Sequence, residues 1–396
     1  MKSPALCQRP LPLGGHVAAD VLEVRNLGQI AHARIEFGDL TVLVGPQAAG
    51  KSLLLQTWKL GLDSGEIVSA LRDAGTSLED KNELLDAYFG EGMSTAWVGK
   101  TRVSINGRPL RPEKLLRAKR AKGRVFFVPA HRALLITEGW PAPFMRLKAD
   151  TPAVARLFSQ SLYDRFTGKQ AGDLFPVERR LKQGVRTLID NAVFHGGTVR
   201  LEKAGLQTRL QLGYGKTQLP FMTWTAGQRE FTPLLLGLYR VLPERSRRKD
   251  EDIEWVIIEE PEMGLHPQAL TAVMALVLDL LWRGYRVVLS THSPVVLDVV
   301  FAIQSLRDKK QGARRLREAF GLPAGAENAR FISEALHKST RTYALEFDEE
   351  LRVHSRDISS LDPGADDATT SGWGGLTDFS GRFGKAISDA VNEEDS

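Results

Sequence analysis

A stretch near the start of the chain, GPQAAGKS at residues 45–52, has the types and spacing of a phosphate-binding loop, G-x-x-x-x-G-K-[ST]. Glycines in this pattern let successive backbone N–H groups curve around phosphate oxygens, and the helix that follows adds its positive N-terminal end. The lysine neutralises phosphate charge and the final hydroxyl can coordinate Mg²⁺. The residues expected to contact phosphate are Gly45, Pro46, Gln47, Ala48, Ala49, Gly50, Lys51 and Ser52.

Two consecutive acids end an apolar run in WVIIEEPEMGLHP, residues 255–267. Burying unpaired carboxylates is costly, so either this strand simply reaches water at Glu259 and Glu260 or a cation lies at its end. The presence of the 45–52 loop favours the second reading. In phosphate-loop nucleotidases, an acid at the end of a second buried strand holds Mg²⁺ and a neighbouring group orients the attacking water. We therefore expect Glu259 to hold the metal and Glu260 to act as general base.

Two further motifs lie on either side of the acidic pair in the sequence, and their order is typical of a nucleotide site. TAGQRE, residues 225–230, opens a predicted helix, so its small residues could direct backbone donors at phosphate. An ordinary helix capped by Thr225 is the alternative. LSTHSP, residues 289–294, places His292 after the strand that follows the acidic pair. A lone histidine there is more often structural, but the order of loop, small-residue motif, acids and histidine favours a nucleotide site.

The elements that must position these motifs alternate between strands and helices, which predicts an α/β fold with a parallel sheet and crossover helices. We expect a hairpin around 94–107 and a basic helix at 113–121. The other predicted strands are 21–27, 33–37, 40–45, 124–129, 198–203, 208–215, 253–260 and 286–290, and the other predicted helices are 52–62, 78–89, 151–195, 224–242, 267–283 and 294–306.

The chain divides, by these patterns, into a large nucleotide-binding unit and flanking segments. The expected parts are an irregular N-terminal segment 1–19, a head 20–310 with a mixed insertion 64–123 and a helical lobe 140–224, a C-terminal helix and hairpin extension 311–356, and a flexible acidic tail 357–396.

Composition excludes several classes of protein. The 396 residues are 42% hydrophobic and 26% charged, which is ordinary for a globular protein. A single cysteine, Cys7, rules out a disulfide framework and a cysteine-based metal site. The N-terminal segment lacks the apolar stretch of a signal peptide. The most apolar segment, 269–282, contains Asp279 and is shorter than the roughly 20 residues a membrane span needs. We expect a cytoplasmic protein without membrane contact.

Basic residues are concentrated in two runs, 108–124 and 240–249, in a chain of net charge +5. Such runs could contact the phosphate backbone of DNA. Solvated helix faces or loops are the alternative, and the sequence does not decide between them.

The set of four motifs resembles the ABC-type ATPases, in the branch that includes SMC proteins, RecF-like repair ATPases and the OLD-like defence ATPases. The string EEPE-x-G-LHP, residues 259–267, is similar to the acidic segment of OLD-like and RecF-like members, and the resemblance covers roughly residues 20–310. It implies a P-loop NTPase fold with an ABC-type head, built from a mixed sheet and a helical insertion that carries the signature motif. It also implies ATP and Mg²⁺ as ligands.

The resemblance also implies roles residue by residue. His292 senses the γ-phosphate, and two copies of the chain bind two ATP molecules between them as a homodimer or higher oligomer. The signature residues that face the partner's ATP are Thr225, Ala226, Gly227 and Gln228, and the D-loop residues that cross the dimer are Leu265 and His266. Thr225 replaces the usual serine. No clear Q-loop glutamine is found, and His131 or Arg132 are weak substitutes.

The sequence lacks two features of related proteins, and this reduces the number of candidate functions. Residues 130–220 lack the heptads of coiled-coil arms, and the acids within 342–357 lack the spacing of a TOPRIM nuclease. We therefore expect an ATPase that couples nucleotide state to a separately encoded effector, such as a nuclease, in anti-phage defence or DNA repair. The alternative is a DNA-binding clamp that uses ATP as a slow conformational switch. A transporter subunit fits less well, because those sequences keep the LSGGQ and Asp-Glu forms.

Overall fold

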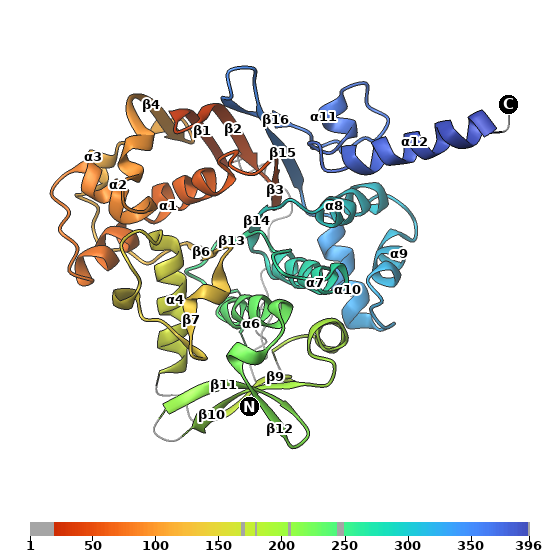
Figure 1. The fold of residues 1–396 in the computed structure, drawn as a ribbon, viewed down its shortest axis with the longest axis horizontal. Coiled ribbons are helices and arrows are strands. Elements are labelled where there is room, and N and C mark those ends of the chain that lie inside the picture. The colour runs from red at the N-terminus through yellow and green to blue at the C-terminus, as the bar shows by residue number, and fades with distance from the viewer. Residues whose placement is uncertain (1–19, 168–170, 179, 205–206, 244–248, 395–396) are drawn as a thin grey trace, which may run out of the picture.

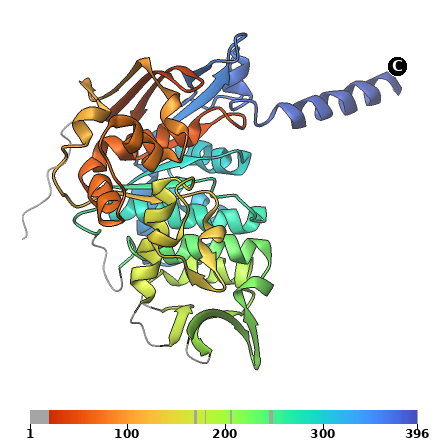
Figure 2. The same cartoon turned by 60° about the vertical axis from the view of Figure 1, so that its left-hand side comes forward.

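A computed structural model describes residues 20–167, 171–178, 180–204, 207–243 and 249–394. In these residues the main feature is a ten-stranded sheet with strand order β5-β4-β1-β2-β16-β15-β3-β14-β13-β6 (Figures 1 and 2). The predicted segment 1–19 and residues 244–248 of the basic run 240–249 lie outside the described residues.

One half of the sheet is parallel and carries the candidate site. Its strands, in spatial order, are β6 (Val125–Val128), β13 (Trp255–Glu259), β14 (Arg286–Ser290), β3 (Leu40–Val44) and β15 (Thr340–Phe347). The crossover helices are α1 (Lys51–Asp73), α7 (Pro267–Arg283) and α8 (Pro294–Leu306). These strands are continuous apolar runs because helices cover both faces. The predicted α/β fold with a parallel sheet is confirmed, and the C-terminal ends of β3, β13 and β14 meet at one edge.

The other half is largely antiparallel and contains β1 (Asp20–Leu27), β2 (Ile30–Phe37), β4 (Trp97–Ile105), β5 (Arg108–Pro109) and β16 (Val353–Asp357). The hairpin predicted around 94–107 is present, because β4 turns at Asn106 and Gly107, where φ is positive, and pairs antiparallel with β5. On its other side β4 pairs with β1. The predicted basic helix is much shorter, α3 (Pro112–Leu115), because the basic side chains that follow are exposed and offer no apolar face.

The C-terminal part of the chain is built into the sheet. Strand β15 pairs with β3 and strand β16 pairs with β2, so the segment expected as an extension fills the middle of the sheet. Helices α9 (Gly312–Ala319) and α10 (Ala326–Leu336) precede these strands. Beyond residue 357, Leu361 and Trp373 are buried, and Trp373 Nε1 donates to the Leu361 carbonyl at 3.0 Å. Core structure thus extends into the predicted tail, which also contains α11 (Ala368–Ser371) and a long helix, α12 (Asp378–Glu394).

A lobe below the main sheet carries the signature segment (Figure 1). Its helices are α4 (Ala153–Phe166), α5 (Gln183–Ile189) and α6 (Ala226–Leu238). The lobe is not only helical, because it holds a second sheet of β9 (Gly172–Phe175), β10 (Thr198–Ala204), β11 (Gln207–Tyr214) and β12 (Thr217–Pro220). The remaining elements are α2 (Lys81–Phe89), the pair β7 (Ile136–Thr137) and β8 (Trp140–Pro141), and the short helices η1 (Met93–Ala96), η2 (Arg132–Leu135), η3 (Phe144–Arg146), η4 (Asp190–Phe194) and η5 (Phe221–Thr223).

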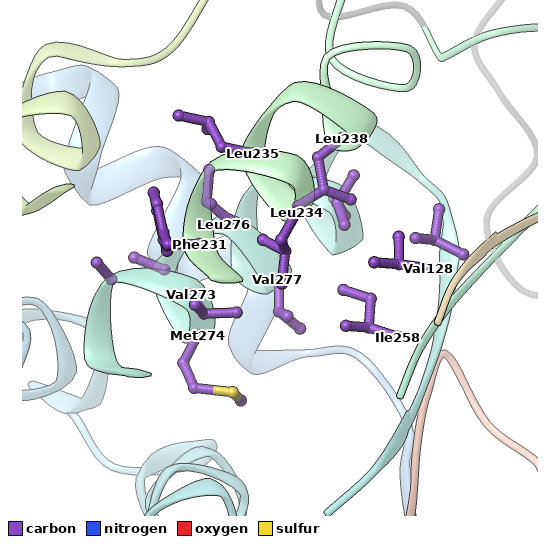
Figure 3. Close-up of a cluster of buried hydrophobic side chains, with 14 of the residues drawn as sticks. Val128, Phe231, Leu234, Leu235, Leu238, Ile258, Val273, Met274, Leu276 and Val277 are labelled. Atoms are coloured by element: carbon purple, nitrogen blue, oxygen red, sulfur yellow. The ribbon is translucent and has the colours of Figure 1, made fainter. Parts of the chain in front are cut away.

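The core between lobe and sheet fixes the acidic strand in place. Figure 3 shows Leu234 of α6 and Val277 of α7 on the side that faces Ile258 of β13, with Phe231 of α6 farther from that strand, and all of them are buried. Pro233 lies inside α6. Burial of these side chains stabilises by roughly 2 kcal/mol each, so the strand that ends in Glu259 is held rigidly. No described helix has the length and apolar character that crossing a bilayer requires.

Candidate functional site

The loop between β3 and α1 has the backbone conformation that phosphate binding requires. Ala48 and Gly50 adopt left-handed conformations with φ of 61° and 80°, and α1 begins directly at Lys51. Gly45 has a φ of 144°, and a Cβ there would lie 2.5 Å from the Leu345 carbonyl oxygen, so only glycine fits. The loop therefore turns tightly against β15 and presents the first N–H groups of α1 to the space above it.

Lys51 is held over this loop by backbone oxygens. Its Nζ donates to the carbonyls of Gly45 and Pro46 at 2.8 and 2.9 Å. Burial lowers the pKa of Lys51 to about 8, although Glu260 and Glu262 favour its charged form. A cation with neutral partners, at the mouth of a phosphate loop, can turn to phosphate oxygens when they arrive.

Glu259 ends β13 and is buried. Its Oε1 has no hydrogen-bond partner among the described residues, and neither has the nearby hydroxyl of Ser290 at the end of β14. Burial raises the pKa of Glu259 to about 7, although a hydrogen bond from Ser52 opposes the rise. A carboxylate oxygen beside a serine hydroxyl is a ligand pair that Mg²⁺ prefers. Within the described part of the chain no group of three or more His, Cys, Asp and Glu could hold a metal alone, so phosphate and water oxygens would complete the shell.

Glu260, the next residue, points into a different environment. Its φ is 42°, an unusual conformation for a residue with a side chain, and its N–H donates to the Ser290 carbonyl at 2.9 Å. Its Oε1 lies 3.6 Å from His292 Nε2, and the hydrogen bond with His292 lowers the pKa of Glu260. Strained backbone at such a point is typical of functional residues. The carboxylate is therefore ionised at neutral pH and is turned away from Glu259.

Sequence reasoning missed Glu262, the third acid of the EEPE string. Its Oε1 accepts a hydrogen bond from the Thr291 hydroxyl at 2.9 Å and another from the backbone N–H of His292. The residue thus joins the turn after β13 to the turn after β14. The EEPE sequence could have indicated this role, because a third acid so close to a buried strand needs hydrogen-bond donors of its own.

A cavity of about 310 Å³ brings three of the four motifs together. Its lining residues are Gln29, Gln47, Ala48, Ala49, Gly50, Lys51, Ser52, Leu53, Gln56, Phe89, Met93, Glu260 and His292. Phe89 and Met93 come from the segment after α1, which motif reasoning did not connect with the site. They add apolar side chains to the lining of the cavity.

The signature segment lies elsewhere. Thr225, Gly227 and Gln228 line a second cavity of about 240 Å³ with Leu265 and His266, and no residue lines both cavities. A Cβ on Gly227 would lie 3.2 Å from the Gly264 carbonyl, so the start of α6 packs closely on the predicted D-loop. These residues cannot contact a nucleotide in the first cavity without moving.

The side chains of the signature segment stabilise the helix start. Thr225 caps α6 by accepting from the Gln228 N–H at 3.3 Å, in a reciprocal capping box. The Gln228 amide donates to the Val193 carbonyl at 3.1 Å and to the Tyr214 hydroxyl at 3.2 Å. Ala226 is exposed beside them. The groups left for another molecule are therefore backbone donors rather than the glutamine side chain.

Arg132, considered as a substitute for the Q-loop residue, is buried and structural. Its guanidinium donates to the backbone carbonyls of Glu230, Pro129, Ala130, Glu259, Glu260 and Pro261. Burial lowers its pKa to about 10, although Glu230 opposes the shift. A side chain committed in this way cannot turn to a nucleotide. His131 is exposed on the same turn.

Comparison with known proteins gives one family match. Residues 206–298 match the model described as "AAA domain, putative AbiEii toxin, Type IV TA system". This segment contains the signature residues, both acids and His292. None of the curated proteins matches the sequence.

Solved structures with a similar arrangement are distant. An SMC head domain from Thermotoga maritima has a TM-score of 0.32 at 14% identity, over 70% of this chain and 90% of its own. An Smc head domain with an extended coiled coil, bound to the C-terminal domain of ScpA and derived from Pyrococcus furiosus, has a TM-score of 0.38 at 11% identity, over 86% and 96%. The cbiO1 protein from Clostridium perfringens, part of the ABC transporter complex cbiONQ, has a TM-score of 0.30 at 13% identity, over 69% and 78%.

These TM-scores are too low to assign the chain to the families of these proteins. The phosphate loop after β3, the acids after β13 and the histidine after β14 lie together at one edge of a parallel sheet. By these features the chain has an α/β P-loop fold, and its residues 206–298 are similar to the AAA domain family that matches them.

Proposed function

We propose that this protein binds ATP with Mg²⁺ in the 310 Å³ cavity and hydrolyses it. One observation carries the proposal: the buried Glu259 oxygen without a partner, beside the Ser52 hydroxyl at the end of the phosphate loop. A buried carboxyl left in this state costs free energy unless a cation binds there. Lys51 supplies the second positive charge that the phosphates need.

The roles of the residues follow from their surroundings. Ser52 and Glu259 would hold Mg²⁺, which would supply positive charge to offset that of the phosphates. Glu260 is the ionised carboxylate facing the cavity and takes a proton from the attacking water. His292, 3.6 Å from it, contacts the γ-phosphate and holds the orientation of Glu260. Glu262 keeps the His292 turn in place.

A second copy of the chain completes the site in this proposal. The signature residues line a cavity separate from the phosphate loop, so they serve the ATP bound by the partner in a head-to-tail dimer. The N-terminus of α6, with Thr225, Ala226 and Gly227, offers backbone donors and a positive helix end. Leu265 and His266 lie beside it, at the surface where the partner would bind.

The nucleotide state would be read by a separately encoded effector, such as a nuclease, in anti-phage defence or DNA repair. The OLD-like acidic string and the family description that mentions an AbiEii toxin both favour defence. Identification of the neighbouring genes and co-purification of their products test this part of the proposal.

The direct test of nucleotide binding is the substitution Lys51→Ala. Removing the ammonium above the loop is expected to weaken ATP binding by 100-fold or more, roughly, because a charge-assisted contact to the phosphates is lost in a buried site. Calorimetric titration with Mg²⁺ and a non-hydrolysable ATP analogue measures it. Lys81→Ala, which changes a half-buried lysine at the start of α2, is the control. Equal affinity for Lys51→Ala and wild type would contradict the site assignment.

A DNA-binding clamp remains the second candidate, and one observation favours it. Five basic side chains of the run 108–124 form no ion pair with any part of the chain that is described, and all are exposed. They are Arg108, Arg111, Lys114, Arg117 and Lys119. In the DNA-binding clamp, ATP would act as a conformational switch with slow turnover, which distinguishes it from the ATPase coupled to an effector. An ATPase assay with and without DNA separates the two.

A further inference from the structure

The segment that joins α1 to β4 lines the 310 Å³ cavity with side chains that phosphate chemistry does not explain. Phe89 ends α2 and is buried, whereas Met93 begins η1 and is 37% exposed, and both side chains line the cavity with the phosphate loop. A phenyl ring and a thioether carry no charge, so neither of them holds a phosphate group or Mg²⁺. This part of the cavity therefore suits an uncharged part of the ligand.

The α2–η1 segment, residues 81–96, is tied to its neighbours on two sides. The Tyr88 hydroxyl at the end of α2 donates to the Gln56 carbonyl of α1 at 2.8 Å. The Gly28 N–H, in the turn between β1 and β2, donates to the Ala96 carbonyl of η1 at 2.9 Å. These bonds hold Phe89 and Met93 beside the cavity before any ligand is bound.

The two ends of the cavity lie on opposite sides of the phosphate loop. The loop follows β3, and in the sheet β14 lies on one side of β3 whereas β2 lies on the other. Glu260 and His292 form the end next to β14. At the other end, a Cβ on Gly28 would lie 3.4 Å from Leu53 Cδ2 and 3.8 Å from Ala96 Cβ, so the β1–β2 turn, α1 and η1 meet there.

This arrangement gives the bound nucleotide a direction. In the proposed function the γ-phosphate lies next to Glu260 and His292, because the attacking water must reach it there. The nucleoside is joined to the opposite end of the triphosphate. It therefore lies at the end of the cavity that the β1–β2 turn and η1 form.

We propose that the α2–η1 segment forms the base subsite, with Met93 and Phe89 in contact with the base, and that the site takes purine nucleoside triphosphates with little choice between adenine and guanine. The inference rests on the proposed function, since it assumes that the phosphates occupy the loop. Apolar contact stabilises in proportion to the area that is covered. The two rings of a purine cover more of these side chains than the single ring of a pyrimidine.

The polar side chains near this end do not distinguish the two purines. Outside the phosphate loop, Glu260 and His292, the polar side chains of the lining are two amides, Gln29 and Gln56. Neither amide is hydrogen-bonded to another described residue, although Gln56 is only 8% exposed. An amide carries a donor and an acceptor, and a half turn exchanges them. It can therefore meet the amino group of adenine or the carbonyl oxygen of guanine.

Calorimetric titration of the full chain with Mg²⁺ and four ligands tests the subsite. The ligands are non-hydrolysable analogues of ATP, GTP and CTP, and tripolyphosphate, which has the phosphates without a nucleoside. Wild type is expected to bind the ATP and GTP analogues with affinities within about fivefold of each other, and the CTP analogue at least about fivefold more weakly than either. A larger difference between the ATP and GTP analogues would overturn the lack of choice, and a CTP analogue bound as tightly would overturn the purine preference.

Met93→Ala tests the contact with the base. Affinity for the ATP and GTP analogues is expected to fall about tenfold, whereas affinity for tripolyphosphate stays within about twofold, because only the nucleoside loses a contact. Met145→Ala makes the same change at a methionine that is 68% exposed and does not line the cavity, so it should match wild type for every ligand. Equal losses for nucleotides and tripolyphosphate, or no loss at all, would overturn the contact.

Lys51→Ala separates the failure of this inference from the failure of the proposed function. Because Lys51 acts on the phosphates, its removal is expected to weaken all four ligands, including tripolyphosphate. If it does so while Met93→Ala binds every ligand as wild type does, only the base contact is wrong. If Lys51→Ala binds the four ligands as tightly as wild type does, or wild type binds none of them, the nucleotide site is wrong and the base subsite is wrong with it.

Discussion

At the residue scale, burial of the Glu259 carboxyl has a consequence for the pH dependence of stability. Its pKa is raised from an ordinary value of 4.5 to about 7 because the carboxyl is buried. The unfolded chain loses this proton at a lower pH than the folded chain does. The free energy of unfolding therefore falls as pH rises from about 4.5 to about 7, by up to about 3 kcal/mol for this one group.

Glu259→Gln is expected to remove that fall. In urea unfolding without nucleotide or Mg²⁺, the variant should gain up to about 3 kcal/mol over wild type on going from pH 5 to pH 8. Glu91→Gln, an exposed glutamate outside the site, is the control and should follow wild type. Parallel pH curves for Glu259→Gln and wild type would show that the carboxyl is not held in an unfavourable state.

Glu262 is expected to matter for catalysis rather than for binding. Glu262→Ala removes the acceptor of the Thr291 hydroxyl and of the His292 N–H, so the histidine turn is released from the acidic strand. We expect kcat to fall roughly tenfold while KM for ATP changes less than about threefold. Thr291→Val removes only one of the two bonds and should have a smaller effect on kcat. A change in KM alone would contradict the positioning role.

At the scale of elements, Arg132 joins the pieces on which the site depends. It donates to carbonyls after β6, after β13 and within α6, and it is fully buried. Arg132→Met keeps the length of the side chain but leaves several buried carbonyls without donors, so a loss of about 3 kcal/mol of unfolding free energy is expected. His131→Ala, on the same turn, should leave stability within about 0.5 kcal/mol. Denaturant unfolding at neutral pH measures both, and equal stabilities would contradict the account.

The strands and helices around the site could be predicted from the sequence, because each is a continuous run with a clear end. Strand β13, helix α7 and strand β14 follow the predicted order closely. The insertion of β15 and β16 between β2 and β3 could not be predicted in this way. Their pairing joins residues about three hundred positions apart, and nothing in a local apolar pattern specifies which strand will lie alongside.

The same limit applies to the site. The loop and the two acids could be predicted because the residues of each motif are adjacent in the sequence. The roles of Glu262 and Arg132 were not, because they depend on which backbone groups folding brings within reach. Helix α12 was underestimated for the opposite reason, since its glycines and exposed charges resemble a flexible tail.

At the scale of the whole molecule, the run 108–124 decides between an ATPase that acts on a protein effector and one that contacts DNA directly. Changing Arg117, Lys119 and Arg120 together to Glu is expected to weaken DNA binding at least tenfold, roughly, and to reduce its salt dependence, if the run holds phosphates. Lys309, Lys310 and Arg315, changed together to Glu, make an equal charge change at another exposed surface as control. Fluorescence anisotropy with duplex DNA measures both, and unchanged affinity in the first variant would remove the DNA-clamp alternative.

The central claim is that ATP is hydrolysed with Glu260 as general base at the edge of the parallel sheet. The most direct measurement is ATP turnover by wild type and by Glu260→Gln, with nucleotide affinity and oligomeric state followed in parallel. We predict that the variant binds ATP as tightly as wild type, turns it over at least 100-fold more slowly, roughly, and accumulates as an ATP-bound dimer. Unaltered turnover in Glu260→Gln would contradict the claim.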